Sequence, residues 1–322
     1  MRALSAIYAL SLCHLACQVD PSKTRVAPTA STKEGLAPTT PPHGGDVAVG
    51  TTTATPVGQV ATIASTAAAP PVPPPKTWSA DPEANRITLT LFERFGVRSD
   101  TEREHMMDGG FRGKIHIVPA EPIGPERHHL EWIKSSYEKT DAWMKQMASL
   151  SPKHRYRTTP IALKFFISEN RTTPSAYAID WSIAYNFRGS LLQTEAGVHE
   201  TFVHETFHLN DQAHDDWSSR TMSELYRRIR TRCGTKSTCY APYSPGTTMV
   251  RGGTYYAFHA DNDVREYAAE LMVRFYKEAD AIFRGAPLPR TAKFKCGPEE
   301  NKLAWEGFVN EFWDGKDPIP GC

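Results

Sequence analysis

The chain has 322 residues, with 37 lysines and arginines against 36 aspartates and glutamates, and its formal net charge is +1. This balance excludes the strong positive field with which proteins attract nucleic acid or an anionic membrane, so we expect no nucleic-acid partner. No run of about eighteen apolar residues occurs, and the sequence therefore predicts no transmembrane helix.

The N-terminal segment has the order of a secretory signal peptide. Arg2 precedes a short apolar core at residues 3–12, and His14-Leu15-Ala16-Cys17 follows. The end of this segment, residues 1–17, resembles the lipobox of bacterial lipoproteins, in which the cysteine becomes lipidated. His14 departs from that pattern, so ordinary signal cleavage is the alternative to lipidation. We expect an exported protein that is secreted, periplasmic or tethered to the outer membrane or cell surface through Cys17.

Residues 18–77 contain no aromatic side chain and are dominated by Pro, Thr, Ala and Gly. Such a segment cannot bury enough apolar surface to fold, so it predicts an extended, disordered linker. The composition changes at Trp78, where aromatic residues become frequent. Residues 78–322 are long enough for one substantial core, and we expect a single domain there.

Hydrophobic patterns predict a mixture of strands and helices in the first half of this domain. Residues 85–95 suit either a strand or a helix, residues 113–119 alternate as a strand does, and residues 125–150 have a helical period. The strongest predicted strands are residues 160–168 and 176–187. We expect the last of these at the sheet edge, where a peptide could be added as a further strand.

The second half reads as mostly helical. Helices are predicted at residues 219–232, 263–284 and 299–313, with a Pro- and Gly-rich loop at residues 241–253. The expected fold class is therefore α+β: a small mixed β-sheet against a long helix, followed by a mostly helical C-terminal subdomain.

Four cysteines lie beyond the leader, an even number that suits an oxidising compartment: Cys233, Cys239, Cys296 and Cys322. Four cysteines allow three pairings. Proximity in the sequence favours Cys233 with Cys239 and Cys296 with Cys322.

The chemistry of the chain centres on residues 204–208, which read H-E-T-F-H. On a helix, His204 and His208 project from one face about one turn apart. Two such imidazoles can hold one zinc ion, with Glu205 placed beside the metal to act on its bound water. An offset pair, His199 and Glu200, precedes them; we expect His199 to point away from the zinc face, at the surface or the helix start.

Two histidines do not complete a zinc site, and two candidates exist for the third ligand. H-E-x-x-H-x-x-D-x-x-H has the metzincin spacing and would use His214, but Asp211 stands where that motif has glycine. Met249 would then serve as the Met-turn. The other candidate is Glu266, which shares a helical face with Glu270 four residues later.

H-E-T-F-H-L-N-D followed by R-E-Y-A-A-E resembles the gluzincin metallopeptidases, in particular the group containing the anthrax lethal factor catalytic domain and the Pro-Pro endopeptidases. The resemblance implies a zincin-like fold and a Zn²⁺ cofactor held by His204, His208 and Glu266. It also implies that Glu205 is the general base and that Glu270 supports a ligating histidine.

The group that stabilises the oxyanion is left open by this comparison. Members of that family often carry a tyrosine seven residues before the ligand glutamate, and His259 occupies that position here, with Tyr255 and Tyr256 slightly upstream. We therefore take His259 and Tyr256 as the candidate catalytic donors.

Together these features predict an exported, monomeric zinc endopeptidase that hydrolyses a peptide or protein substrate through a zinc-bound water. Two alternatives remain at this stage. One is a metzincin-like peptidase with His214 as third ligand, and the other is a non-catalytic surface lipoprotein stabilised by zinc.

Overall fold

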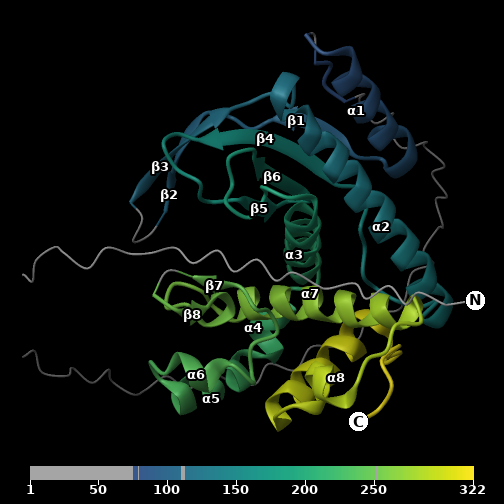
Figure 1. Cartoon of the computed structure of the whole chain (residues 1–322), viewed down its shortest axis with the longest axis vertical. Coiled ribbons are helices and arrows are strands. Elements are labelled where there is room, and N and C mark those ends of the chain that lie inside the picture. The colour runs from purple at the N-terminus through teal and green to yellow at the C-terminus, as the bar shows by residue number, and fades with distance from the viewer. Residues whose placement is uncertain (1–74, 79, 110–112, 251) are drawn as a thin grey trace, which may run out of the picture. The chain divides into compact units, whose positions relative to one another are not determined.

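The structure, a computed structural model of the whole chain, describes residues 75–78, 80–109, 113–250 and 252–322 (Figure 1). The expected signal peptide at residues 1–17 and nearly all of the expected linker at residues 18–77 lie outside the described residues. The described residues all belong to one unit by their internal contacts.

The first helix, α1 (Pro82–Phe95), includes the segment that the pattern left as strand or helix. Asp81 caps its start by accepting hydrogen bonds from two backbone N–H groups of the first turn, and proline follows the cap. Gly96 ends the helix in the left-handed conformation at φ 68°. Just before the helix, the fully buried Trp78 donates from Nε1 to Thr88 Oγ1 at 2.8 Å.

Six strands form one mixed sheet in the order β2-β3-β4-β6-β5, with β1 pairing β4 (Figure 1). The parallel pairs are β1 with β4 and β4 with β6, and the other pairs are antiparallel. The strands are β1 (Arg98–Thr101), β2 (His105–Asp108), β3 (Lys114–Pro119), β4 (Ala162–Ser168), β5 (Ala176–Ile179) and β6 (Ser182–Asn186).

The prediction of one strand over residues 176–187 is wrong. The segment is a hairpin of β5 and β6, turned at Asp180 and Trp181, whose φ angles are 49° and 54°. Two-residue turns with positive φ are ordinarily marked by Asn or Gly, and Asp-Trp carries no such mark. Only the first half of the predicted strand, β5, therefore lies at the edge of the sheet.

Helix α3 (Glu195–Ala213) lies between two hydrophobic cores. Its side chains Val198 and Phe202 pack with the sheet, α1 and α2 (His128–Leu150), which follows a short 3-10 turn. Val203 and Phe207 belong instead to the core of the C-terminal half. Because α3 is held from both sides, it is well placed to carry side chains that must be fixed precisely in space.

The C-terminal half is mostly helical, as predicted, apart from one two-residue strand in the expected loop and a second directly after it. The predicted helix at residues 219–232 is divided at Met222 into two. The elements are α4 (Trp217–Thr221), α5 (Ser223–Cys233), α6 (Ser237–Tyr240), β7 (Met249–Val250), β8 (Thr254–Tyr255), η3 (Tyr256–Phe258), α7 (Val264–Phe283), η4 (Arg290–Ala292), η5 (Phe294–Cys296) and α8 (Glu299–Trp313).

The predicted disulfide pairing is confirmed. Cys233 bonds to Cys239 and Cys296 to Cys322, with Cα–Cα distances of 5.3 and 5.5 Å. The first bond joins the end of α5 to α6, and the second ties the last residue of the chain to η5.

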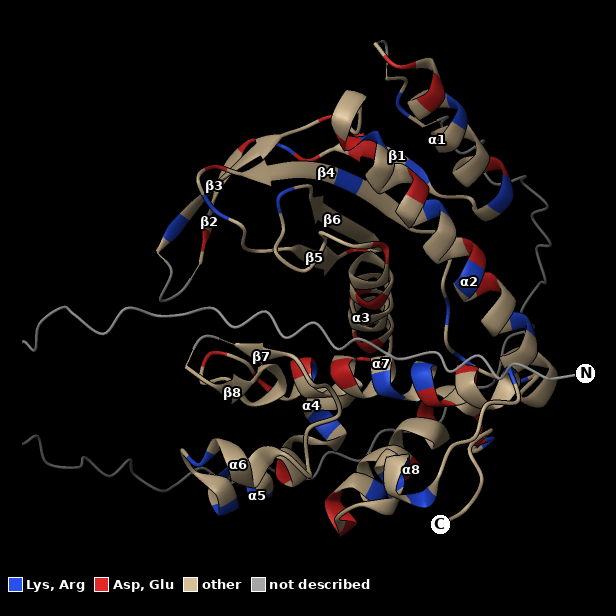
Figure 2. Ribbon diagram, in the orientation of Figure 1, with Lys and Arg blue, Asp and Glu red and all other residues tan. Residues whose placement is uncertain are grey.

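Charges of both signs alternate along α1 and α2 (Figure 2). Many of them form local pairs, such as Arg86 with Glu83 at 2.6 Å and Lys145 with Asp141 at 2.7 Å. None of the described helices combines the length and the apolar character of a membrane-spanning segment.

Candidate metal centre

Three potential metal ligands converge from two helices that are distant in sequence. His204 and His208 come from α3 and Glu266 from the first turn of α7. The two Nε2 atoms lie 3.1 Å apart. Glu266 Oε2 lies 3.1 Å from His204 Nε2, and its other oxygen, Oε1, lies 3.6 Å from His208 Nε2. One ligand atom from each residue lies within 4.8 Å of the others, and no second such group occurs in the described part of the chain.

This geometry fits a tetrahedral cation. Zinc bound at about 2.0–2.1 Å by nitrogen and oxygen holds its ligand atoms about 3.3 Å from one another. The two Nε2 atoms, and Glu266 Oε2 with His204 Nε2, have separations close to this value. Two imidazoles and one carboxylate are also a donor set that zinc accepts, and they leave a fourth position for water or substrate. Without a proton or a metal ion between them, the lone pairs of these side chains would repel one another at such short distances. A proton or a metal ion must therefore lie between them.

His204 and Glu266 shift one another's pKa values in opposite directions. Burial by itself lowers the pKa of His204, but its hydrogen bonds to Glu266 and Glu270 raise that pKa well above the ordinary value. Burial raises the pKa of Glu266. The hydrogen bonds and charges of His204 and His208 have a larger, opposite effect and hold that pKa well below its usual range. These two directions favour an imidazolium at His204 paired with an ionised Glu266.

Zinc binding should consequently release about one proton at pH 7, because a ligating imidazole must be neutral. Since the folded pKa of His204 is raised, protons compete with zinc at and below neutral pH, and the apparent zinc affinity should increase as the pH rises. Calorimetric titrations in buffers of different ionisation enthalpy count the protons. Zinc binding without proton release at pH 7 would contradict this pairing.

Glu270 lies on the other side of His204. Its Oε1 is 3.5 Å from His204 Nδ1, the position expected for a carboxylate that fixes the orientation of a ligating histidine. Gly246 lets the preceding loop approach Glu270 closely, because a Cβ at that position would lie 1.5 Å from Glu270 Oε2. Sequence reasoning missed Gly246, and a glycine in a Pro-rich loop gives no signal of this contact.

Gly246→Ala should push Glu270 away from His204 and lower zinc affinity about 10- to 100-fold, the usual cost of losing a partner behind a metal ligand. Gly321→Ala, where an added Cβ meets nothing within 4 Å, is the control. Competition titration with a zinc chelator measures both. Equal zinc affinity in the two variants would show that Glu270 does not support the site.

Glu205 is 7% exposed and follows His204 directly on α3. Burial raises the pKa of Glu205 above its ordinary value. The charges of His204 and His208 lower this pKa, whereas the charge of Glu266 raises it. A carboxylate with a raised pKa takes up a proton more readily near neutral pH, as a general base requires.

Tyr256, one of the two candidate oxyanion donors, packs against the metal group. Its ring centroid is 6.0 Å from that of His204. Burial, together with the charges of Glu266 and Glu205, raises the pKa of Tyr256 well above its usual value, so the hydroxyl remains a donor. His259 Nδ1 lies 3.4 Å from Asp261 Oδ2 in the loop before α7.

The structure gives His214 a different partner. Its Nδ1 lies 2.7 Å from Glu311 Oε1 on α8, and it does not belong to the group of converging ligands. Met249 is 50% exposed, unlike a residue packed beneath a metal site. The arrangement therefore favours Glu266 over His214 as third ligand.

Asp211 also differs from the metzincin glycine that it would replace. It lies within α3, is 1% exposed, and accepts hydrogen bonds from the backbone N–H of Ser218 at 2.7 Å and its hydroxyl at 2.6 Å. The chain turns later, at Asp215 and Asp216, whose φ angles are 56° and 51°. Asp211 thus fastens the end of α3 to the start of α4.

The second His-Glu pair is not part of the metal group. Glu200 forms an ion pair with Lys277 at 2.8 Å. His199 lies near the start of α3, one of the two positions expected for it, but it is only partly exposed and both of its ring nitrogens are enclosed.

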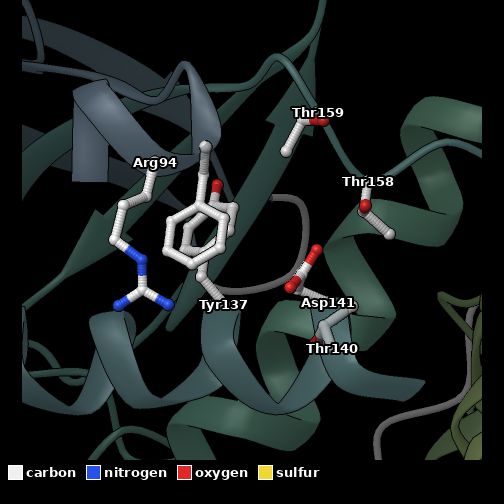
Figure 3. Close-up of a pocket in the computed structure, with 7 residues that line it drawn as sticks. Arg94, Tyr137, Thr140, Asp141, Thr158 and Thr159 are labelled. Carbon is white, nitrogen blue, oxygen red and sulfur yellow. The ribbon is translucent and has the colours of Figure 1, made fainter. Parts of the chain in front are cut away.

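A cavity of about 190 Å³ is also present, but none of the metal group lines it (Figure 3). It lies among α1, α2 and the loop before β4. Its lining residues are Arg94, Phe95, Tyr137, Thr140, Asp141, Thr158 and Thr159.

Comparisons with known proteins add no relative: no protein-family model, no curated protein and no solved structure matches this chain. Function is therefore argued from the site itself.

Proposed function

We propose that this protein is a zinc-dependent endopeptidase of the gluzincin type, built on a zincin-like fold. The observation that carries the proposal is the convergence of His204, His208 and Glu266 next to a buried Glu205. A site that only stabilised the fold would have no need of a buried carboxylate beside its ligands, since structural zinc sites close all four positions with protein ligands.

The chain's own residues supply proton transfer and charge stabilisation. A divalent ion held by the three ligands acts as a Lewis acid and makes water a stronger nucleophile. Glu205 accepts the proton of the attacking water and passes it to the departing amine. Tyr256 donates a hydrogen bond from its hydroxyl to the oxyanion that forms on the substrate carbonyl.

The substrate that suits this arrangement is an extended peptide. Strand β5 is at the edge of the sheet and close to α3, and Ile179 at its end is 50% exposed. The unpaired edge of such a strand offers backbone N–H and C=O groups to which a peptide can bind as one more strand. This binding mode recognises the peptide backbone irrespective of most side chains.

We also propose that the enzyme works outside the cytoplasm. The two disulfides are compatible with an oxidising compartment. The sequence of residues 1–17 adds the signal-peptide pattern and the candidate lipidation site at Cys17.

The direct test is cleavage of casein or a peptide library by the purified protein with zinc and with a chelator. Cleavage that requires the metal supports an endopeptidase. Stoichiometric zinc without cleavage of any peptide would instead favour the non-catalytic, zinc-stabilised protein.

Tyr256→Phe should lower kcat roughly 100-fold while zinc content stays unchanged, because the variant lacks one hydrogen-bond donor to the oxyanion. His259→Ala should have a smaller effect. Steady-state kinetics on one peptide substrate compare the two variants. A larger loss in His259→Ala would assign the oxyanion donor to His259.

A further inference from the structure

Tyr256, the proposed oxyanion donor, lies in a segment that is too short to hold itself in place. The 3-10 helix η3 (Tyr256–Phe258) is one turn long and lies between the two-residue strand β8 and the loop before α7. A single turn fixes several backbone dihedral angles for few hydrogen bonds, so it is marginal by itself. A catalytic group nevertheless has to be within about 0.5 Å of its productive position. Contacts from other parts of the fold must therefore hold Tyr256.

Both backbone groups of Tyr256 are hydrogen-bonded. Its N–H donates to the carbonyl of Thr248 at 2.9 Å. Its carbonyl accepts from the side-chain Nδ2 of Asn262 at 2.8 Å and from the backbone N–H of His259 at 3.1 Å. Of these three partners, Asn262 alone uses its side chain, so a substitution there removes one of these bonds and leaves the others possible.

A second support comes from Tyr226 on α5, which is 7% exposed. Its hydroxyl donates to the carbonyl of Ala257, the residue after Tyr256, at 3.0 Å. Its ring stacks on Phe258, with centroids 5.5 Å apart and an angle of 8° between the planes. Tyr240 on α6 also stacks on Phe258, at 4.5 Å. Two helices thus hold η3 by one hydrogen bond and two ring contacts.

We propose that Tyr226 and Asn262 are positioning residues, which hold η3 so that Tyr256 stays against the metal group and its hydroxyl can reach the oxyanion. Neither of them belongs to the converging ligands, and Tyr256 is the residue that contacts His204. The catalytic consequence rests on the proposed function. The hold on Tyr256 itself can be measured without a substrate.

Tyr226→Phe and Asn262→Ala test the proposal in steady-state kinetics. Tyr226→Phe keeps the ring on Phe258 and removes only the hydroxyl. Each variant should lower kcat about tenfold, less than the roughly 100-fold expected when the donor itself is lost. KM and zinc content should not change, because the donor acts only in the transition state. Tyr243→Phe is the control, at a buried tyrosine whose hydroxyl accepts from Arg232 instead, and it should leave kcat unchanged.

Double-mutant cycles determine whether the two residues act through Tyr256. In a Tyr256→Phe background, Tyr226→Phe or Asn262→Ala should cause little further loss of kcat, because the hydroxyl that they position is already absent. General structural damage would multiply the two losses instead. Multiplied losses would overturn the proposal, and so would wild-type kcat in both single variants.

Hydrogen–deuterium exchange supplies the readout that needs no substrate. In the zinc-reconstituted full-length protein, both variants should exchange about fivefold faster over residues 254–262, the factor expected for the loss of one net hydrogen bond. Exchange over residues 204–208 of α3 should stay unchanged. If the wild type cleaves no peptide, the proposed function fails, but the exchange rates still decide whether Tyr226 and Asn262 hold Tyr256. Wild-type exchange in both variants would overturn the proposal.

Discussion

Replacing Glu205 by glutamine should leave zinc bound and lower turnover about 10²- to 10⁴-fold, the contribution that a general base ordinarily makes. The amide has nearly the shape of the carboxylate but cannot accept the proton of the attacking water. Glu205 is not one of the three converging ligand residues, so zinc content should remain near that of the wild type.

Glu200→Gln is the matched control for this variant. It lies on the same helix and is likewise a glutamate, but it is exposed and paired with Lys277. Its turnover should equal that of the wild type within a small factor. Peptidase activity retained in Glu205→Gln would refute the proposed role of that residue, whatever the zinc content.

The second large effect concerns the third ligand. Glu266→Ala should lose zinc, with a drop in affinity beyond the 10- to 100-fold that removing a supporting partner costs. His214→Ala should keep near-stoichiometric zinc, because its imidazole is bonded to Glu311 on α8. Elemental analysis after zinc reconstitution and chelator-free purification separates the two variants.

The opposite result would restore the metzincin-like alternative. If His214→Ala lost zinc and Glu266→Ala kept it, the site would have to be reassigned. If the wild-type protein took up no zinc even after reconstitution, the peptidase proposal would fail altogether. Loss of zinc in both variants calls for thermal unfolding curves, since His214→Ala also removes a contact between the end of α3 and α8.

Local patterns in the sequence were sufficient for most of the helices. Helix α8 has the predicted bounds, and the helix on which the H-E-T-F-H motif was expected to lie is α3. Periodicity records which face of an element is buried, and that is enough to place an element of this kind. It does not record a turn without Gly or Asn, which is why the hairpin at Asp180 was missed.

The sequence alone also favoured the observed disulfide pairing and placed the two histidines on one helical face. Cys233 and Cys239 are near enough that a short loop brings them together, and residues four apart on one helix must share a face. In these cases the chain itself sets the distance between the groups.

Only the tertiary structure decided what surrounds those histidines. Glu266 is 62 residues from His204, and their contact depends on how α7 crosses α3. The same packing brings Tyr256 against His204 and Gly246 against Glu270. It also places His214 within hydrogen-bonding distance of Glu311. The pattern of each segment encodes a buried face but not its partner, so only the packing of α3, α7 and α8 distinguishes one candidate ligand from the other.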